Sequence, residues 1–85
     1  MNDFLPIGSV VKLKELKHFV AICGYYPTYK DERKDYFGVL LPFGKSESNP
    51  MLYFYMDDIE EIVFEGYHDK SFNVTKVLLE SFQKR

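Results

Sequence analysis

The stretch from Met51 to Tyr67 constrains the fold of this chain more than any other. It contains two short apolar runs, Met51–Met56 and Ile62–Phe64, separated by a segment rich in aspartate and glutamate. Aromatic-rich runs of this length favour β-strands, and a row of acidic side chains stays in water unless it is paired. The stretch therefore predicts a strand, a tight acidic turn at Asp57–Glu61 and a second strand. Within the turn, Asp58 is expected to cap a single helical turn, with Glu61 at the third position of a capping box.

Alternating or continuous apolar runs predict three further strands before this stretch. Turn-forming residues separate the runs, including the proline-led and charged segment Tyr26–Lys34, which is expected to be an exposed hairpin loop. The second run is apolar on both faces, as in a central strand that is covered on both sides. The expected strands are Ser9–Lys14, His18–Tyr25, Asp35–Leu41, Met51–Met56 and Glu61–Glu65.

The segment Asp69–Arg85 has the period of an α-helix. Apolar side chains recur at intervals of three and four residues, with Asp69 or Ser71 as the expected N-cap. Phe72 and Leu79 make the apolar sector wider than one packing contact requires. The recurring residues are Val74, Val77, Leu78 and Phe82.

Together these elements predict an α+β, mainly β fold. About five short strands would form a curled antiparallel sheet similar to an SH3-like small barrel, with one C-terminal helix across an open face or edge. The 85 residues are expected to form a single domain, 1–85, with a loose tail at 1–4, the sheet at 5–67 and the helix at 69–85. The expected core residues are Val11, Leu13, Val20, Ile22, Leu40, Leu52, Phe54, Ile59, Ile62 and Phe64.

The net charge and the cysteine content indicate the kind of partner and the cellular compartment to expect. The formal net charge is -2, so the electrostatics do not favour nucleic acid as a required partner. Cys23 is the single cysteine, which excludes an internal disulfide and agrees with a reducing compartment. The segment Met1–Pro6 has no basic region and no long apolar run of a signal peptide, and no segment has the length of a membrane helix. We therefore expect a cytoplasmic protein without membrane insertion.

Residues with catalytic or metal-binding chemistry form no recognisable site. The acidic turn fits a solvated, capped turn better than a carboxylate pair, because its spacing matches no calcium loop. His18 and His68 lie far apart in the sequence, and Cys23 lies in an apolar strand where it is expected to behave as a small hydrophobic residue. We expect neither an enzyme nor a cofactor or metal.

Basic and aromatic residues leave one alternative open. Lys12, Lys14 and Lys17 precede the second strand, and a second cluster with Lys30, Arg33 and Lys34 is interleaved with tyrosines. On a small barrel such residues line single-stranded nucleic acid, although neighbouring acids neutralise the second cluster. A nucleic-acid-binding or regulatory small barrel is therefore the alternative function.

The chain has more aromatic residues than its expected core needs. Tyr25, Tyr26, Tyr53 and Tyr55 are left for the outside, where tyrosine is typical of protein interfaces. Coverage of these rings by the chain's own helix is an equally open alternative. The candidate partner-binding residues are Tyr53, Tyr55, Val74, Val77, Leu78 and Phe82.

Three stretches resemble a known family in their order and spacing. They are Leu-Pro-Ile-Gly-Ser-Val-Val-Lys-Leu-Lys at 5–14, Tyr-Phe-Gly-Val-Leu-Leu-Pro-Phe-Gly at 36–44 and Asp-Ile-Glu-Glu-Ile-Val-Phe-Glu-Gly-Tyr at 58–67. From Leu5 to Phe72 the chain is similar to a family of small cytoplasmic proteins of Gram-positive bacteria, catalogued as a domain of unknown function. Its members are commonly encoded beside LXG-type toxins of the type VII secretion system. The segment Tyr26–Lys34 and the residues after Phe72 depart from the pattern.

The resemblance implies a non-enzymatic accessory or targeting chaperone. Its partner would be the helical N-terminal LXG domain of a toxin before export, together with a second small helical accessory protein. The family supplies no catalytic residue, and self-association stays open. Tyr53 and Asp57 also match the spacing of a type VII export signal, but that signal follows a helical hairpin, whereas Tyr53 lies on an expected strand.

Overall fold

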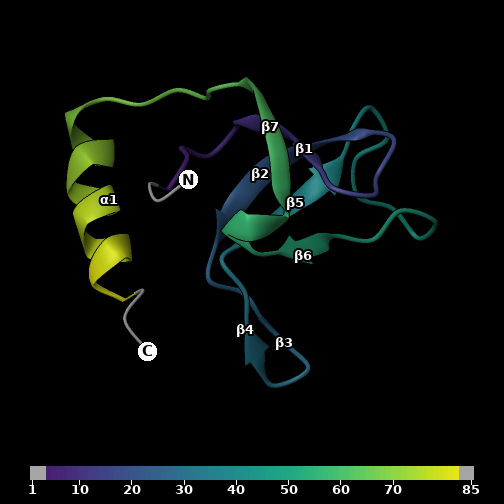
Figure 1. Ribbon diagram of the computed structural model, residues 1–85, viewed down its shortest axis with the longest axis horizontal. Coiled ribbons are helices and arrows are strands. Elements are labelled where there is room, and N and C mark those ends of the chain that lie inside the picture. The colour runs from purple at the N-terminus through teal and green to yellow at the C-terminus, as the bar shows by residue number, and fades with distance from the viewer. Residues whose placement is uncertain (1–3, 83–85) are drawn as a thin grey trace.

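A computed structural model describes residues 4–82 and consists of seven strands, one 3-10 turn and one α-helix (Figure 1). Both ends of each long strand lie within two residues of the ends expected from the sequence. The helix ends at Ser81, four residues before the expected end, and residues 83–85 lie outside the described part. The elements are β1 (Val10–Leu13), β2 (Phe19–Tyr25), β3 (Thr28–Tyr29), β4 (Glu32–Arg33), β5 (Tyr36–Leu40), β6 (Leu52–Phe54), η1 (Met56–Asp58), β7 (Ile59–Phe64) and α1 (Lys70–Ser81).

The long strands form one antiparallel sheet in the order β6-β5-β2-β1-β7. The expected hairpin loop between β2 and β5 forms a separate two-stranded sheet, β3-β4. The mainly β fold with a C-terminal helix is therefore confirmed. Closure into a barrel is not seen, because no pairing joins the edge strands β6 and β7 within the described residues.

The central strand β2 is covered on one face only. Val20 and Ile22 are fully buried, whereas Ala21 and Cys23, which point the other way, are half-buried, and Phe19 is exposed. The expectation of cover on both faces is wrong, because α1 does not lie over this face. Gly24 lies directly beneath the ring of Phe37, where a Cβ would stand 2.3 Å from the ring carbons.

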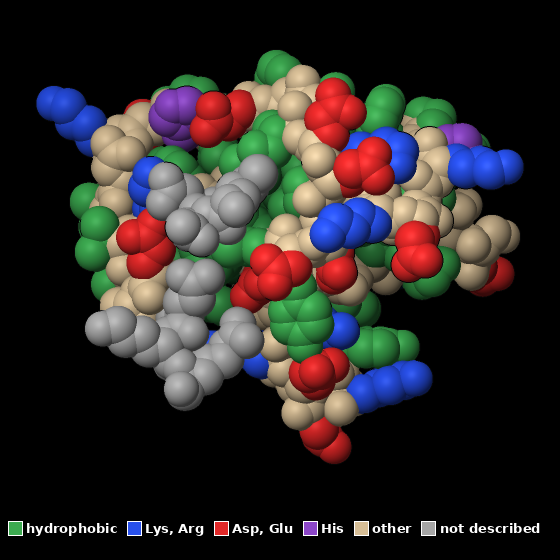
Figure 2. Space-filling view, in the orientation of Figure 1, with side chains coloured by type: hydrophobic (Ala, Val, Ile, Leu, Met, Phe, Trp, Pro, Cys, Tyr) green, Lys and Arg blue, Asp and Glu red, His purple; other side chains and the backbone are tan. Residues whose placement is uncertain are grey.

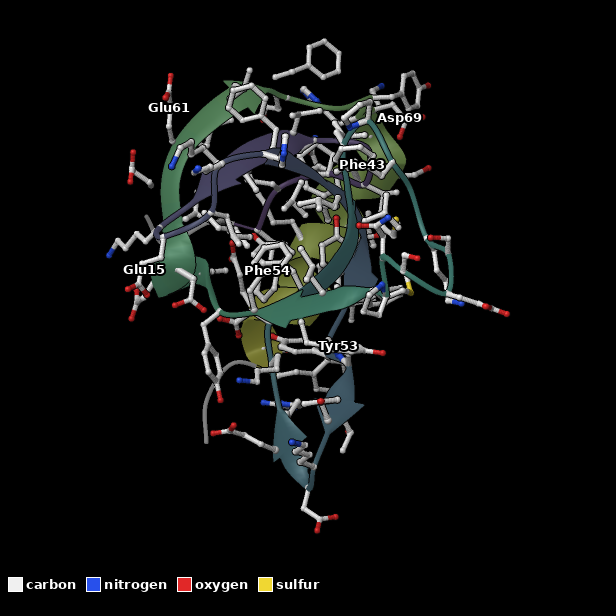
Figure 3. The ribbon with its side chains drawn as sticks, turned by 90° about the vertical axis from the view of Figure 1, so that its right-hand side faces the viewer. Glu15, Phe43, Tyr53, Phe54, Glu61 and Asp69 are labelled. Carbon is white, nitrogen blue, oxygen red and sulfur yellow. The ribbon has the colours of Figure 1, made fainter. Side chains whose placement is uncertain are left out.

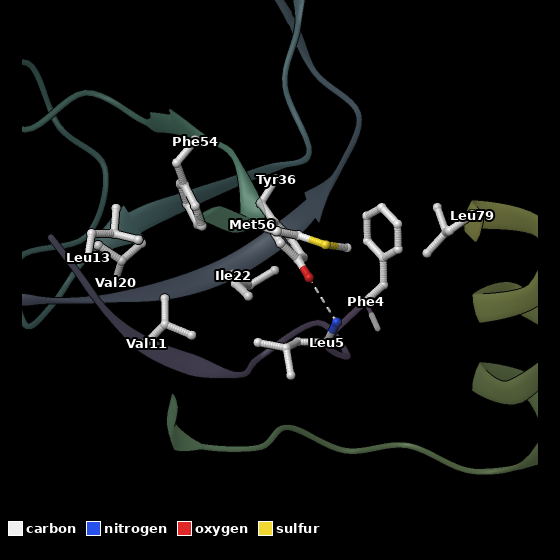
Figure 4. Packing of buried hydrophobic residues seen from close by; sticks show 10 residues of the cluster. All are labelled: Phe4, Leu5, Val11, Leu13, Val20, Ile22, Tyr36, Phe54, Met56 and Leu79. Carbon is white, nitrogen blue, oxygen red and sulfur yellow. Dashed lines mark hydrogen bonds between the residues drawn. The ribbon is translucent and has the colours of Figure 1, made fainter. Parts of the chain in front are cut away.

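The buried core is centred on Tyr36, Ile22 and Phe4 (Figure 4). The main chain of Leu5 lies between two tyrosines: its N–H donates to the Tyr36 hydroxyl at 3.0 Å, and its carbonyl accepts from the Tyr25 hydroxyl. Phe4 is 2% exposed and packs edge-on against the rings of Tyr25 and Tyr26. The expectation of a loose tail is thus wrong for Phe4, because these rings give it an apolar site, and residues 1–3 lie outside the described part.

The acidic turn forms earlier than expected, because its N-cap is Tyr55, three residues before the expected cap Asp58. The backbone N–H of Tyr55 donates to the Asp58 carboxylate at 2.9 Å, so Asp58 is the third residue of the turn and not its cap. The carboxylate of Asp35 accepts from the N–H of Met56 at 2.8 Å, which anchors the turn to the start of β5. The expected box between Asp58 and Glu61 is wrong, because Glu61 already belongs to β7.

Most expected core residues are buried, but the last strand is an exception. Val11, Leu13, Val20, Ile22 and Phe54 are buried, and Leu40, Leu52 and Ile59 pack partly buried against them. Ile62 and Phe64 are instead 37% and 60% exposed. These side chains are exposed because β7 is an edge strand, and its pairing with β1 is interrupted by two register shifts.

Candidate functional site

The helix α1 begins at a well-formed N-cap. The Asp69 carboxylate accepts from the N–H groups of Ser71 at 2.9 Å and Phe72 at 3.3 Å, so of the two N-caps expected from the sequence Asp69 is confirmed and Ser71 is not the cap. The Tyr67 hydroxyl also donates to this carboxylate, and this bond, followed by those from the helix amides, lowers the pKa of Asp69. The cap fixes where the helix starts and hence which side chains face the sheet.

A narrow inner face attaches α1 to the rest of the molecule. Leu79 is 8% exposed and lies opposite Phe4 (Figure 4). The Tyr26 hydroxyl donates to the Leu79 carbonyl, and the Tyr26 ring lies edge-on to Phe82. Arg33 from the hairpin donates to the Phe82 carbonyl at 2.6 Å, while its guanidinium lies 4.5 Å from the centre of the Tyr26 ring. These contacts involve the C-terminal half of the helix.

The opposite face of α1 is apolar and exposed to solvent. Val74 and Val77 are each 65% exposed, Leu78 is 55% and Phe82 is 57% exposed. Successive helix residues are turned by about 100°, so Val74 and Val77 lie on the side opposite Leu79. Leu78 lies between the two sides, and Phe82 lies closer to Leu79 and contacts Tyr26 at the edge of its ring. We call Val74, Val77, Leu78 and Phe82 the α1 outer stripe. The sequence predicted these residues as partner-binding, and the structure places them together.

Tyr53 and Tyr55, the other predicted partner-binding residues, hold the hairpin in place. The Tyr53 ring stacks on Tyr29 of β3 with the ring centres 4.9 Å apart, and it points from β6 toward the hairpin (Figure 3). The Tyr55 ring lies under the Lys34 ammonium, 4.4 Å from its centre. A hydrogen bond from Tyr55, and then the pairing with Lys34, lower the pKa of Glu32. Tyr53 remains 37% exposed and Tyr55 is half-buried.

The structure does not bring these tyrosines together with the α1 outer stripe. Figure 1 shows α1 at one side of the molecule, set apart from β6. Tyr25 and Tyr26, which were expected on the outside, are half-buried against the core because they enclose Phe4. The predicted binding residues therefore divide into a helix face and a separate tyrosine cluster.

Sequence reasoning missed a second exposed apolar surface. Ile62, Val63 and Phe64 are consecutive on β7 and all are more than a third exposed; we call them the β7 strip. A buried strand would hide alternate side chains, but each register shift leaves one β7 residue without a partner on β1. The acids on either side of the strip, Glu61 and Glu65, were the available signal, since they favour an edge strand over a central one.

The two histidines and the cysteine lie against an aromatic ring or a backbone carbonyl group. The His18 ring lies edge-on to Phe43, and Nδ1 of His68 lies 3.3 Å from the Gly66 carbonyl oxygen. The Cys23 thiol is half-buried, with Sγ 3.7 Å from the carbonyl oxygen of Ala21. Among residues 4–82, no three histidine, cysteine, aspartate or glutamate side chains are grouped so that they could hold a metal ion. No helix in the same range has the length and apolar character needed to cross a membrane.

The basic residues of the nucleic-acid alternative are partly paired with acids. Lys12 lies 3.7 Å from Glu60 and also donates to the carbonyl of Leu13. Lys34 lies 3.4 Å from Glu32. Pairing of this kind leaves less free positive charge for phosphate groups than the sequence count suggests.

The fold and its surfaces define a class: a small, mainly β domain with a C-terminal helix and exposed apolar surface. Residues 4–83 match the family described as domain of unknown function DUF4176, and the chain belongs to this family. The match includes the Tyr26–Lys34 segment and the helix, which had departed from the pattern of the resemblance. Comparison with curated proteins found no match, and comparison with solved structures found none.

Proposed function

We propose that this protein is a non-enzymatic binding protein whose α1 outer stripe docks on a helix of a protein partner. One observation carries the proposal. Four apolar side chains at helical spacing are each more than half exposed, and Val74 and Val77 among them lie on the side of α1 turned away from Leu79. An apolar stripe at this spacing is the surface that pairs with the apolar face of another helix.

The energetics favour such docking. Burying a valine, leucine or phenylalanine side chain completely contributes about 1.5–3 kcal/mol, so even partial burial of the stripe supports binding. The helix is already ordered by its Asp69 cap and its contacts with Tyr26 and Arg33, so little ordering entropy is lost on docking. A partner helix that is marginally stable by itself would be stabilised by mass action.

The partner in this proposal is the helical N-terminal LXG domain of a type VII secreted toxin. The resemblance of 5–14, 36–44 and 58–67 to proteins encoded beside such toxins supports this choice, and a helical domain supplies the apolar helix face that the stripe needs. The protein would act in the cytoplasm as an accessory or targeting chaperone before export. A second small helical accessory protein would complete the complex.

We also propose that the sheet is a curled one of the SH3-like type. The strand order β6-β5-β2-β1-β7 and the 3-10 turn directly before the last strand support an SH3-like small barrel. In this arrangement α1 would stand at one end of the curled sheet and present its outer stripe away from it.

Co-purification tests the proposed function. The N-terminal LXG domain of a type VII toxin is co-expressed with the tagged protein, as wild type or as the double variant Val74→Ser and Val77→Ser. We expect the wild type to elute with the LXG domain as one peak on size exclusion, and the variant to lose at least about tenfold in affinity. Phe43→Ser is the matched control, because Phe43 is 53% exposed on a loop away from α1.

Two outcomes contradict the proposal. Separate elution of the wild-type protein and the LXG domain removes the proposed partner. Co-elution that survives the double variant, while its unfolding midpoint equals that of wild type, removes the α1 outer stripe as the binding surface.

A further inference from the structure

The β7 strip differs from the α1 outer stripe in its charged surroundings. The exposed acids Asp57, Glu60, Glu61 and Glu65 lie on or directly beside β7. Figure 2 shows acidic side chains beside this strand, with hydrophobic ones between them and basic ones among them. The α1 outer stripe itself contains no charged residue, and the charged residues of the helix are two lysines and one acid, Lys70, Lys76 and Glu80.

The acids near β7 outnumber the cations of the neighbouring strand. Lys12 is opposite Glu61 in register and pairs with Glu60 at 3.7 Å. Lys14 follows Leu13, which pairs with Ile59 at the first end of β7. At the other end Val10 lies opposite Phe64, so Glu65 has no lysine of β1 beside it in the register.

The edge of β7 is poorly suited to accept a further strand. Its register with β1 shifts between Val10 and Val11 and again between Lys12 and Leu13, which leaves Val63 and Glu60 as the extra residues. Bulges of this kind bend a strand and interrupt the even row of backbone groups that an added strand needs. A ligand of this surface would therefore bind through side chains and not through a β-ladder.

We propose that the β7 strip and its acids form a second docking surface, which takes a basic amphipathic helix of another protein. The apolar side chains of that helix would cover Phe64 and the neighbouring bulged Val63, and its lysines or arginines would lie against Glu61 and Glu65. Phe64 is 60% exposed and shares its face of the sheet with Val10, so it provides an aromatic anchor at the centre of the surface. The surface is distinct from the α1 outer stripe, so the protein would join two partners of different chemistry.

Charge argues against a second copy of this chain as the occupant. Two copies that met through β7 would bring Glu61 and Glu65 of each molecule toward those of the other. Like charges across an interface oppose association, whereas opposite charges speed encounter and fix the register of the complex. A basic partner is therefore favoured over self-pairing.

Binding of designed peptides tests the second surface in the full-length protein. Three fluorescent probes of equal length are compared by anisotropy: a Leu/Lys helix with leucines at i, i+3, i+4 and i+7, its Leu/Glu counterpart, and an alternating Val/Lys strand peptide. We expect the Leu/Lys helix to bind best and to weaken with rising salt. Glu65→Lys should weaken it about threefold to tenfold, and Phe64→Ser about tenfold or more.

Matched controls separate this surface from the rest of the molecule. Glu47→Lys makes the same change in net charge as Glu65→Lys but on a loop, and Phe43→Ser removes an exposed phenylalanine elsewhere. Both controls, and the variant Val74→Ser with Val77→Ser, should leave binding of the Leu/Lys helix unchanged.

Several results would overturn the second surface. These are equal binding of the Leu/Lys and Leu/Glu helices, stronger binding of the strand peptide, no binding of the Leu/Lys helix, or equal effects of Glu65→Lys and Glu47→Lys. Loss of binding in the α1 variant would assign the probe to the α1 outer stripe instead. Self-association that disappears in Phe64→Ser would show that a second copy occupies β7. None of these results depends on whether an LXG domain binds α1.

Discussion

The two faces of α1 differ in a way that the sequence alone does not reveal. The face with fewer apolar residues, centred on Leu79, packs against Phe4 and Tyr26. The face with more apolar residues, represented by Val74 and Leu78, lies in water. A helix with a single packing surface would bury its more apolar face and expose the less apolar one. The difference indicates that α1 has two packing surfaces, of which the molecule itself uses the smaller.

Replacement of Phe4 by alanine tests the packing of the inner face of α1, and it is the change for which we expect the largest loss of stability. Phe4 is buried among Tyr25, Tyr26 and Tyr36 and lies opposite Leu79, so Phe4→Ala should lower the free energy of unfolding by about 3–5 kcal/mol. Urea unfolding followed by circular dichroism measures the loss. Phe43→Ala, at an exposed site, should change it by no more than about 0.5 kcal/mol. Equal losses in the two variants would contradict the buried position of Phe4.

Two adjacent leucines give the sharpest comparison of the two faces. Leu79 is 8% and Leu78 is 55% exposed, although they differ by one position in the helix. Leu79→Ala should cost about 2–4 kcal/mol of stability because it leaves a cavity beside Phe4. Leu78→Ala should cost no more than about 0.5 kcal/mol, since alanine is a good helix former and little buried surface is lost. If chemical denaturation reversed this order, the assignment of the inner and outer faces would be wrong.

Alkaline pH should weaken the tyrosine cluster that supports the inner face. Burial raises the pKa of Tyr25 from 10.0 to about 12 and also raises that of Tyr36. The unfolded chain therefore loses these protons first, so the stabilisation is complete below pH 10.0 and is lost as the pH rises through about 12. Unfolding midpoints measured across this range should fall more steeply for wild type than for Tyr25→Phe. Parallel curves for the two proteins would contradict the raised pKa of Tyr25.

Removal of the helix cap should have a smaller effect and should concern α1 alone. In Asp69→Ala the N–H groups of Ser71 and Phe72 lose their acceptor, so the helical circular-dichroism signal should decrease. Hydrogen bonding lowers the pKa of Asp69 below 3.8, so its contribution is present above that pH and is lost as the pH falls through the lowered value. The control Glu47→Ala should keep the wild-type acid profile. An unchanged helix signal in Asp69→Ala would show that the cap is dispensable.

The sequence was sufficient for the five long strands and the helix, and it narrowed the helix cap to two residues. Alternation placed Val11 and Leu13 correctly in the core, and the helix-forming pattern gave two candidate N-caps, Asp69 and Ser71, of which Asp69 is the cap. These features depend on local periodicity and turn chemistry, which one chain displays directly. The candidate residues of the α1 outer stripe were likewise recognised from their spacing.

The errors concern contacts between segments that are distant in the sequence. Phe4 has no periodic neighbour that indicates burial, because its partners Tyr25, Tyr26 and Tyr36 meet only after the strands have paired. The exposure of Phe64 depends on β7 being the edge of the sheet, and strand order is not encoded in one strand. The tertiary contacts thus decided which apolar residues were buried.

Thiol labelling of the α1 outer stripe tests the central claim most directly. Cys23 is replaced by alanine, and Leu78→Cys or Leu79→Cys supplies the one remaining thiol. In the protein alone, Leu78→Cys should react at nearly the rate of a denatured control and Leu79→Cys far more slowly. Addition of the LXG domain should slow the labelling of Leu78→Cys by about tenfold or more, because the partner covers the stripe. Slow labelling of Leu78→Cys without a partner, or an unchanged rate in a saturated complex, would contradict the account.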